Sequence, residues 1–271
     1  MACTWIYKGI VIGFGLLLLH CSDLDRDNLL DPKNPASRTA QKIMIEAFVN
    51  INSNPNVPEP PPVNQVMIEA LDSLESMYAD QIVIAEYHRT AGLQKEYTDA
   101  CHREENDILY QLYLNALHSD QEGTPDVFFN GTEHRLRGAS DKVSAFSRLQ
   151  EILLFQLSLN SSLSMEIDWT ESGNKITPAI TIARLGGTSI EDVLIKCVLT
   201  TDFKSDHLHR VVQKSNKSSL IPRLGVSEIM TVTLPEMTID RNLENHLIAM
   251  ITNEDETIIF QTASLEIPST Q

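Results

Sequence analysis

Residues 123–131 have the sequence Gly-Thr-Pro-Asp-Val-Phe-Phe-Asn-Gly, and the organisation of the chain can be worked out on either side of them. The apolar run at 126–129 predicts a short strand. The Asn-Gly pair that follows accepts the positive φ angles of a type I′ turn, so residues 133–137 are expected to return as the second strand of a β-hairpin. Pro125 stands directly before the first of these strands.

A strand, a helix and a second strand precede the hairpin. Residues 43–49 form a β-rich apolar run, which predicts a buried strand, and the Asn- and Pro-dense stretch 50–62 interrupts it. Apolar residues then recur at helical spacing over 64–78, which predicts an amphipathic helix. The run 81–87 is apolar through its middle, as in a strand buried on both sheet faces. Because a helix connects the two strands, they are expected to be parallel.

Two further helices are predicted in this part of the chain. The apolar positions of residues 99–117 share one helical face, and Asp99 is placed to cap the start of that helix. Ser140-Asp141 is placed to cap a last helix, whose apolar stripe ends at Leu157. The predicted order from residue 43 to residue 157 is therefore β-α-β-α-β-β-α.

The tail from 163 to 267 is predicted to be all-β. Runs of strand-forming residues recur there, separated by breakers such as Gly186-Gly187 and Pro222. Seven strands at this spacing favour an immunoglobulin-like sandwich. The strands are expected at 164–169, 175–184, 192–201, 207–213, 228–234, 243–252 and 257–267. Cys197 alternates with apolar residues along the third strand, so its thiol is expected to point into the core.

The amino terminus has the features of an export signal. Residues 1–20 carry one charge before an apolar run that is shorter than the ~20 residues needed to span a bilayer. The run ends at Cys21 and is similar to a bacterial lipobox, in which this cysteine is lipidated, although His20 departs from the small residue expected before the cut. The alternative is an uncleaved membrane anchor. Residues 21–40 lack apolar periodicity, which predicts a tether. We therefore expect a lipoprotein signal peptide over 1–20, a tether over 21–40, and domains over 41–160 and 161–271.

The overall charge argues against a nucleic-acid partner. The 271 residues include 21 Lys and Arg against 37 Asp and Glu, which gives a formal net charge of −16. Binding to phosphate backbones depends on Lys and Arg, because these residues displace counterions. The expected partners are instead the membrane, through the N-terminal lipid, and a protein or peptide.

The segment 43–157 resembles a thioredoxin-like domain, because Thr124-Pro125 stands where that fold keeps a cis-proline before its third strand. It is more closely similar to bacterial thioredoxin-like outer-membrane lipoproteins, which carry a β-sandwich after the thioredoxin part. The similarity rests on Ile45-Glu46-Ala47-Phe48, the helix around Ala70-Leu71, the run from Val83 to His88, and the run from Gly123 to Gly131. The resemblance implies an α/β thioredoxin-like domain followed by an all-β immunoglobulin-like sandwich, located in the cell envelope at the outer membrane.

The resemblance also implies where the chemistry of such a domain would lie. Thioredoxin-like proteins hold a redox Cys-x-x-Cys at the start of the first helix, which corresponds here to Val57-Pro58-Glu59-Pro60. Both cysteines are missing, so the domain is expected to be redox-inactive. A groove remains, in which the backbone beside Thr124 and Pro125 would pair with an extended peptide and the loop 54–62 would form a wall. The alternative is that Pro125 only shapes the core.

Other chemistry has little support in the sequence. Four cysteines without a Cys-x-x-Cys spacing argue against a zinc module and an ordinary dithiol enzyme. Cys101 and Cys197 are expected to be separate thiols, with a disulfide between them as the alternative. His207 and His209 would share a strand face without an evident third ligand, and Ser140 lacks a Gly-x-Ser-x-Gly elbow. We expect no metal, no cofactor and no assigned catalytic residue.

The expected function is that of a membrane-anchored extracytoplasmic lipoprotein that acts as a protein- or peptide-binding or scaffolding module. The competing hypothesis is a thiol-dependent oxidoreductase or chaperone-like enzyme that uses Cys101 as a lone thiol, or a hydrolase without a recognisable motif. A third hypothesis is a purely structural component of the envelope.

Overall fold

The structure is a computed structural model that describes residues 31, 34–51, 63–90, 99–204 and 208–269. Several predicted features lie outside these residues. They are the signal peptide with His20 and Cys21, the segment Val57-Pro58-Glu59-Pro60, and His207.

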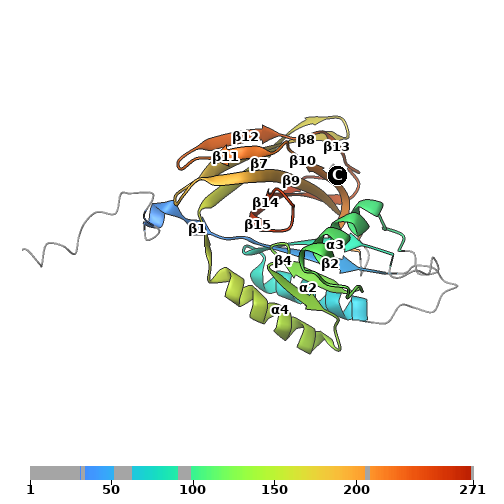
Figure 1. The fold of residues 1–271 in the computed structure, drawn as a ribbon. Helices are drawn as coiled ribbons and strands as arrows, with labels where there is room; N and C mark the ends of the chain where they lie inside the picture. Colours follow the sequence, from blue (N-terminus) through green and yellow to red (C-terminus); the bar gives the residue numbers. More distant parts are fainter. Residues whose placement is uncertain (1–30, 32–33, 52–62, 91–98, 205–207, 270–271) are drawn as a thin grey trace, which may run out of the picture.

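Strands and helices alternate in the first half of the described chain (Figure 1). The elements are β2 (Ile43–Val49), α2 (Val63–Tyr78), β3 (Ile82–His88), α3 (Glu104–Ala116), β4 (Asp126–Phe129), β5 (His134–Arg137) and α4 (Lys142–Leu157). A 3-10 turn, η2 (Pro35–Ser37), and the two-residue strand β1 (Thr39–Ala40) precede them. β1 pairs with β6 (Asn160–Ser161), which follows α4.

The second half of the described chain is built from strands. They are β7 (Leu163–Ser172), β8 (Lys175–Arg184), β9 (Ile190–Asp202), β10 (Val211–Lys217), β11 (Ile221–Leu224), β12 (Ile229–Thr233), β13 (Met237–Thr238), β14 (Glu244–Asn253) and β15 (Ile259–Ile267). β10 begins later than the predicted range, and β11 and β13 were not predicted. β7, β8, β12 and β13 form one sheet, which packs on the sheet of β9, β14 and β15 around a shared apolar core. The second half is therefore a β-sandwich.

β10 joins the two halves of the protein into one sheet of order β15-β14-β9-β10-β3-β2-β4-β5, with β11 beside β9. Val211 of β10 pairs in parallel with Glu86 of β3, and the Glu86 N–H donates to the Arg210 carbonyl at 3.0 Å. On its other edge, β10 pairs antiparallel with β9 from Val211 to Lys217. The sheet therefore contains strands from both sides of residue 160, which is the predicted boundary between the two domains. The division of the chain at that residue stays a prediction.

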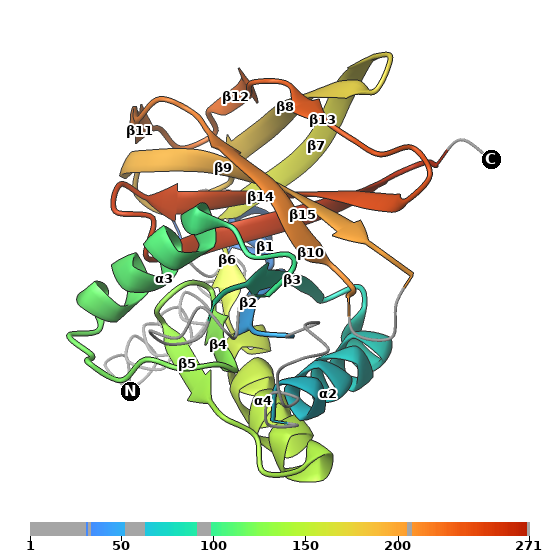
Figure 2. The same ribbon diagram turned by 90° about the vertical axis from the view of Figure 1, so that its right-hand side faces the viewer.

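The predicted fold class, a thioredoxin-like α/β domain followed by an immunoglobulin-like sandwich, is wrong, because the protein is predominantly β. The physical reason lies in what covers β2. One face of β2 packs against α2 and α4, as in an α/β domain. The other face, which carries Met44 and Phe48, packs against α3 and also against the C-terminal strands through Ile248, Met250 and Ile259. Figure 2 shows β14 and β15 lying over this part of the sheet.

Local signals located several elements correctly. Asp141 caps α4, since its Oδ1 accepts a hydrogen bond from the Ser144 N–H at 2.9 Å. Asn130 and Gly131 have φ angles of 48° and 74°, as the hairpin turn requires.

The predicted cap at Asp99 was wrong. Asp99 does not cap α3, because that helix begins at Glu104 with Arg103 at its N-cap position. The Thr124-Pro125 peptide bond is cis.

Within the described residues, none of the helices has both the length and the apolar character needed to cross a membrane.

Candidate functional site

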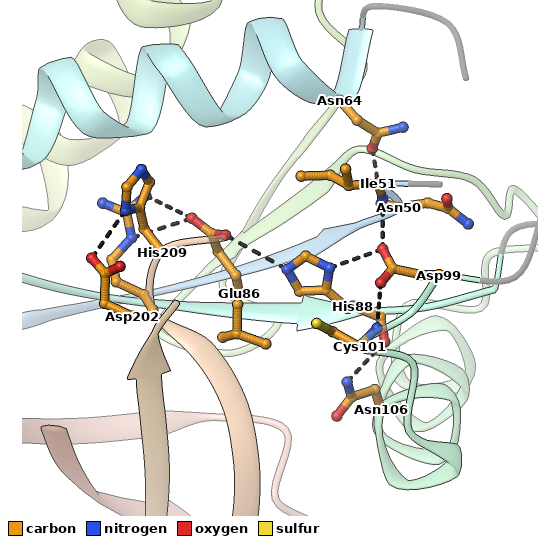
Figure 3. A network of polar contacts seen from close by, with 12 residues as sticks. Asn50, Ile51, Asn64, Glu86, His88, Asp99, Cys101, Asn106, Asp202 and His209 are labelled. Atoms are coloured by element: carbon orange, nitrogen blue, oxygen red, sulfur yellow. Dashed lines mark hydrogen bonds and ion pairs between the residues drawn. The ribbon is translucent and has the colours of Figure 1, made fainter. Parts of the chain in front are cut away.

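A buried polar network lies at the end of β3, where His88 is the last residue of the strand (Figure 3). The His88 side chain is fully buried. Its Nδ1 lies 2.8 Å from Oδ2 of Asp99, and its Nε2 lies 3.7 Å from Oε2 of Glu86. Glu86 is two residues earlier on the same strand, so both side chains project from the same face. The imidazole is therefore held between two carboxylates.

Asp99 connects this histidine to the end of β2 and to Cys101. The Ile51 N–H donates to Asp99 Oδ2 at 2.6 Å, and the Cys101 N–H donates to Asp99 Oδ1 at 2.7 Å. Cys101 is half-buried and makes no disulfide. Its Sγ, a ring nitrogen of His88 and a carboxylate oxygen of Asp99 all lie within 4.8 Å of one another. Two carboxylate oxygens thus fix the position of the histidine and of the backbone that carries the thiol.

Asparagine side chains extend the network to α2 and α3. Asn64 Oδ1, at the start of α2, accepts from the Asn50 N–H at 3.2 Å, and its Nδ2 donates to Thr124 Oγ1 at 3.5 Å. Asn106 Nδ2 of α3 donates to the His88 carbonyl at 2.9 Å. The ends of β2 and β3 and the starts of α2 and α3 therefore meet at this network.

The environment shifts the pKa values of His88 and Cys101 upward. Burial by itself would lower the pKa of His88, but the hydrogen bonds and charges of Asp99 and Glu86 outweigh it and raise the pKa to about 9. Burial and the negative charge of Asp99 raise the pKa of the Cys101 thiol, which nearby Arg103 opposes. At neutral pH the site therefore holds an imidazolium and a protonated thiol.

The free energy of unfolding is expected to fall by about 3 kcal/mol between pH 6.5 and pH 9 because of His88. The folded protein binds the His88 proton more tightly than the unfolded chain does. This stabilisation is fully present below pH 6.5 and is lost as the pH rises through about 9. Urea unfolding monitored by circular dichroism across this window measures the change. His88→Gln should flatten the profile, and an equally steep profile in that variant would refute the assignment to His88.

An ion-pair cluster lies beside the network. Arg210 Nη2 donates to Glu86 Oε1 at 2.6 Å and to Asp72 Oδ1 at 2.6 Å, and Nη1 bonds Glu75. The attraction of these carboxylates raises the pKa of Arg210 against the effect of burial. Glu86 is therefore shared between the Arg210 guanidinium and the His88 ring.

A groove of about 520 Å³ lies between α3 and β10, next to the network. Side chains of α3 from Glu105 to Leu112 form one wall, and β10 residues Val212–Lys217 form the other. The innermost lining residues include Tyr87, which is 2% exposed, and Lys196, which is 5% exposed. Arg103 ties the walls together, since its Nε donates to the Val212 carbonyl at 3.2 Å.

Charged and phenolic side chains gather at the groove and in the core behind it. Lys196 Nζ lies 3.7 Å from Glu256 Oε2, and Lys217 also pairs with Glu256. Tyr113 donates a hydrogen bond to Oε2 of the fully buried Glu46 at 2.6 Å. Burial raises the pKa of Glu46 and of Tyr87. The groove therefore combines an apolar wall on α3 with a polar wall on β10, and it includes the charged pair Lys196 and Glu256, a mixture typical of ligand sites.

The structure relates some of the residues singled out in the sequence and separates others. Thr124 Oγ1, just before β4, accepts a hydrogen bond from Nδ2 of Asn64 at the start of α2. Val57, Pro58, Glu59 and Pro60 lie outside the described residues. The role of Thr124 and Pro125 in peptide binding stays a prediction. Cys101 and Cys197 are both free thiols. His209 precedes β10 and contacts Asp202 at 3.0 Å, so its placement on a strand was wrong.

Glu86, His88 and Asp99 were not predicted as a site from the sequence. A signal was present, since Glu86 and His88 are two polar residues at alternate positions in a strand that is otherwise apolar. Their partners could not be inferred, because no periodic pattern relates Asp99 to His88 and because Arg210 is 124 residues away from Glu86.

The sequence matches no protein-family model and no curated protein. Solved structures that resemble most of the chain include the following two. A structural-genomics protein from Agrobacterium tumefaciens is 18% identical with a TM-score of 0.52, over 86% of this chain and 97% of that one. HBP35 of Porphyromonas gingivalis is 10% identical with a TM-score of 0.57, over 86% of this chain and 78% of that one. Likenesses at these identities show the fold alone.

A domain of the outer-membrane lipoprotein Omp28 from Porphyromonas gingivalis has a TM-score of 0.30 at 8% identity, over 40% of this chain and 90% of that one, which is too low to carry an argument. The resemblance to thioredoxin-like outer-membrane lipoproteins was wrong, because the structure and the solved structures similar to it are rich in β-sheet. The interpretation of residues 57–60 as a degenerate redox site loses its basis with that resemblance.

Proposed function

We propose that this protein is a lipid-anchored, extracytoplasmic binding protein whose groove between α3 and β10 receives an extended, acidic peptide segment of a partner protein. The observation that carries the proposal is the groove itself, in which an apolar helix face lies opposite a strand edge. The location in the cell envelope is supported by the apolar leader that ends at Cys21 and by the tether that follows it.

The strand edge supports an extended occupant. β10 pairs with β9 along one edge from Val211 to Lys217. On its other edge, Val211 pairs with Glu86, and the stretch from Gln213 to Lys217 has no strand partner among the described residues. A strand edge of this kind can accept an added peptide strand through main-chain hydrogen bonds, while neighbouring side chains give specificity.

The helix wall offers apolar contacts to such a peptide. Ile108 of α3 lines the groove and is 63% exposed, and Leu112 lines it as well. Covering an exposed isoleucine beside this strand edge removes apolar area from water and so lowers the free energy of the complex.

The charge of the lining favours an acidic occupant. Four of the six charged lining residues are basic, namely Arg103, Lys196, Lys214 and Lys217, against Glu105 and Glu256. The whole chain carries a formal net charge of −16, so the groove is a basic site on an acidic protein. Complementary charge increases the association rate and disfavours basic partners.

A thiol-dependent enzyme is less well supported. Burial and Asp99 raise the pKa of Cys101, whereas a nucleophilic cysteine needs a lowered pKa to provide thiolate at neutral pH.

Charge reversal in the groove is expected to weaken peptide binding by about tenfold or more. The probe is a fluorescent peptide of alternating Val and Glu, compared with its Val and Lys counterpart, and binding is measured by fluorescence anisotropy. Lys214→Glu and Ile108→Asp should each weaken binding of the acidic peptide. Lys142→Glu is the matched control, because Lys142 is exposed at the start of α4, away from the groove lining.

A second peptide tests the strand-addition mode. It has the sequence of the acidic peptide, but its backbone nitrogens are methylated. Methylation removes the N–H donors without changing the side chains, so the methylated peptide should not bind if the acidic peptide pairs with β10. Equal binding of the acidic and basic peptides, or unchanged binding by Lys214→Glu and Ile108→Asp, would refute the proposal.

A further inference from the structure

Three side chains with different ligand atoms converge at the end of β3: the imidazole of His88, the carboxylate of Asp99 and the thiol of Cys101 (Figure 3). Their ligand atoms lie within 4.8 Å of one another. His88 and Asp99 are buried, and Cys101 is half-buried. We propose that His88, Asp99 and Cys101 form a binding site for a divalent transition-metal ion of the zinc type. This site is separate from the proposed peptide groove.

The donor set defines the class of metal. Nitrogen, sulfur and oxygen donors together match Zn²⁺, which accepts Cys, His and Asp ligands, whereas Mg²⁺ and Ca²⁺ prefer oxygen alone. Zn²⁺ bonds of about 2.0–2.3 Å place neighbouring ligand atoms roughly 3.5 Å apart. Small side-chain adjustments from the observed spacing therefore suffice to enclose an ion. Three protein ligands leave a fourth position for water or another ligand.

The residues around His88 and Asp99 orient these side chains in the way that neighbouring groups orient the ligands of a metal site. Metal-bound histidines commonly direct their second nitrogen at a carboxylate. His88 Nε2 faces Oε2 of Glu86 at 3.7 Å, and neither atom has a hydrogen-bond partner among the described residues. The other oxygen of Glu86 is fixed by Arg210 at 2.6 Å. Asp99 is oriented by the N–H groups of Ile51 and Cys101.

Cobalt(II) is the probe for this site, because Co²⁺ can occupy zinc-binding sites and because a Co²⁺–thiolate bond gives an absorption band. Titration of the full-length protein with Co²⁺ should produce a thiolate-to-cobalt band in the near ultraviolet, and an equivalent of Zn²⁺ should remove it. Cys101→Ser should abolish the band. The Cys197→Ser variant is the matched control that should keep it, because Cys197 lies in the sandwich core and outside the cluster.

A second measurement does not require any variant to fold. Zn²⁺ should slow alkylation of Cys101 in the wild-type protein by tenfold or more, measured by mass spectrometry of its peptide, whereas Mg²⁺, which prefers oxygen ligands, should leave the alkylation unchanged. Asp99→Asn, with its fold checked by circular dichroism, should weaken Co²⁺ binding by at least tenfold. Absence of the cobalt band in the wild type, its persistence in Cys101→Ser, or unchanged alkylation with Zn²⁺ would overturn the proposal.

Discussion

Replacing Gly131 by alanine is expected to lower the free energy of unfolding by roughly 4 kcal/mol. Gly131 has φ +74°, a conformation that costs an L-residue ~1–2 kcal/mol. An added Cβ would also lie 2.3 Å from the Thr257 carbonyl oxygen, a contact that forces the backbone apart. That oxygen accepts the Thr132 N–H at 2.7 Å, so moving it also disrupts the contact between the hairpin and the segment before β15. Chemical denaturation measured by circular dichroism gives the change.

Gly173→Ala is the matched control for this prediction. Gly173 has a similar φ of +63°, but an added Cβ there has no atom within 4 Å. It should cost only the conformational penalty, about 1–2 kcal/mol. Equal losses in the two variants would show that the close approach of Thr257 to the hairpin is absent.

Replacing Arg210 by methionine is expected to lower the free energy of unfolding by about 3–5 kcal/mol. Arg210 bonds Glu86, Asp72 and Glu75, and the Glu86 side chain is fully buried. Methionine preserves much of the aliphatic volume but leaves the Glu86 charge buried beside His88 alone. An uncompensated buried charge is far more costly than the loss of an exposed ion pair. The same denaturation experiment measures the effect.

The exposed partners of Arg210 supply the controls. Asp72 and Glu75 side chains are 39% and 40% exposed, so Asp72→Asn and Glu75→Gln should each cost less than about 1 kcal/mol. Arg210→Met combined with Glu86→Gln should be more stable than Arg210→Met alone, because the buried charge is removed with its partner. A loss below about 1 kcal/mol in Arg210→Met would contradict the assigned role of Glu86.

The elements that sequence analysis located correctly depend on contacts between near neighbours. Asp141 caps α4 through the N–H three residues later, and Asn130-Gly131 forms its turn within the hairpin. β8 lies at its predicted range, because its apolar residues alternate along the strand. Each of these signals is contained within a few residues, so no knowledge of the rest of the fold was needed.

The errors arose where a distant segment decides the outcome. β10 contains the polar run Gln213–Lys217, which gives no apolar pattern, and its pairing with β9 fixes its position. Asp99 is a good helix-capping residue by its position in the sequence, but the structure uses it to bind His88 and Ile51. The predicted fold class was wrong for the same reason. The apolar residues of β2 indicate that both of its faces are buried, but they do not indicate which segments cover each face.

The sequence by itself determined which segments form strands and helices over much of the chain, the hairpin turn at Asn130-Gly131, the cap at Asp141 and the excess of negative charge. Only the tertiary structure decided that the C-terminal strands, together with α3, cover the second face of β2, and that Glu86, His88, Asp99 and Cys101 meet. Local conformation depends on residues a few positions apart, whereas burial and the pairing of buried charges depend on segments that chain entropy keeps separate until the sheet forms.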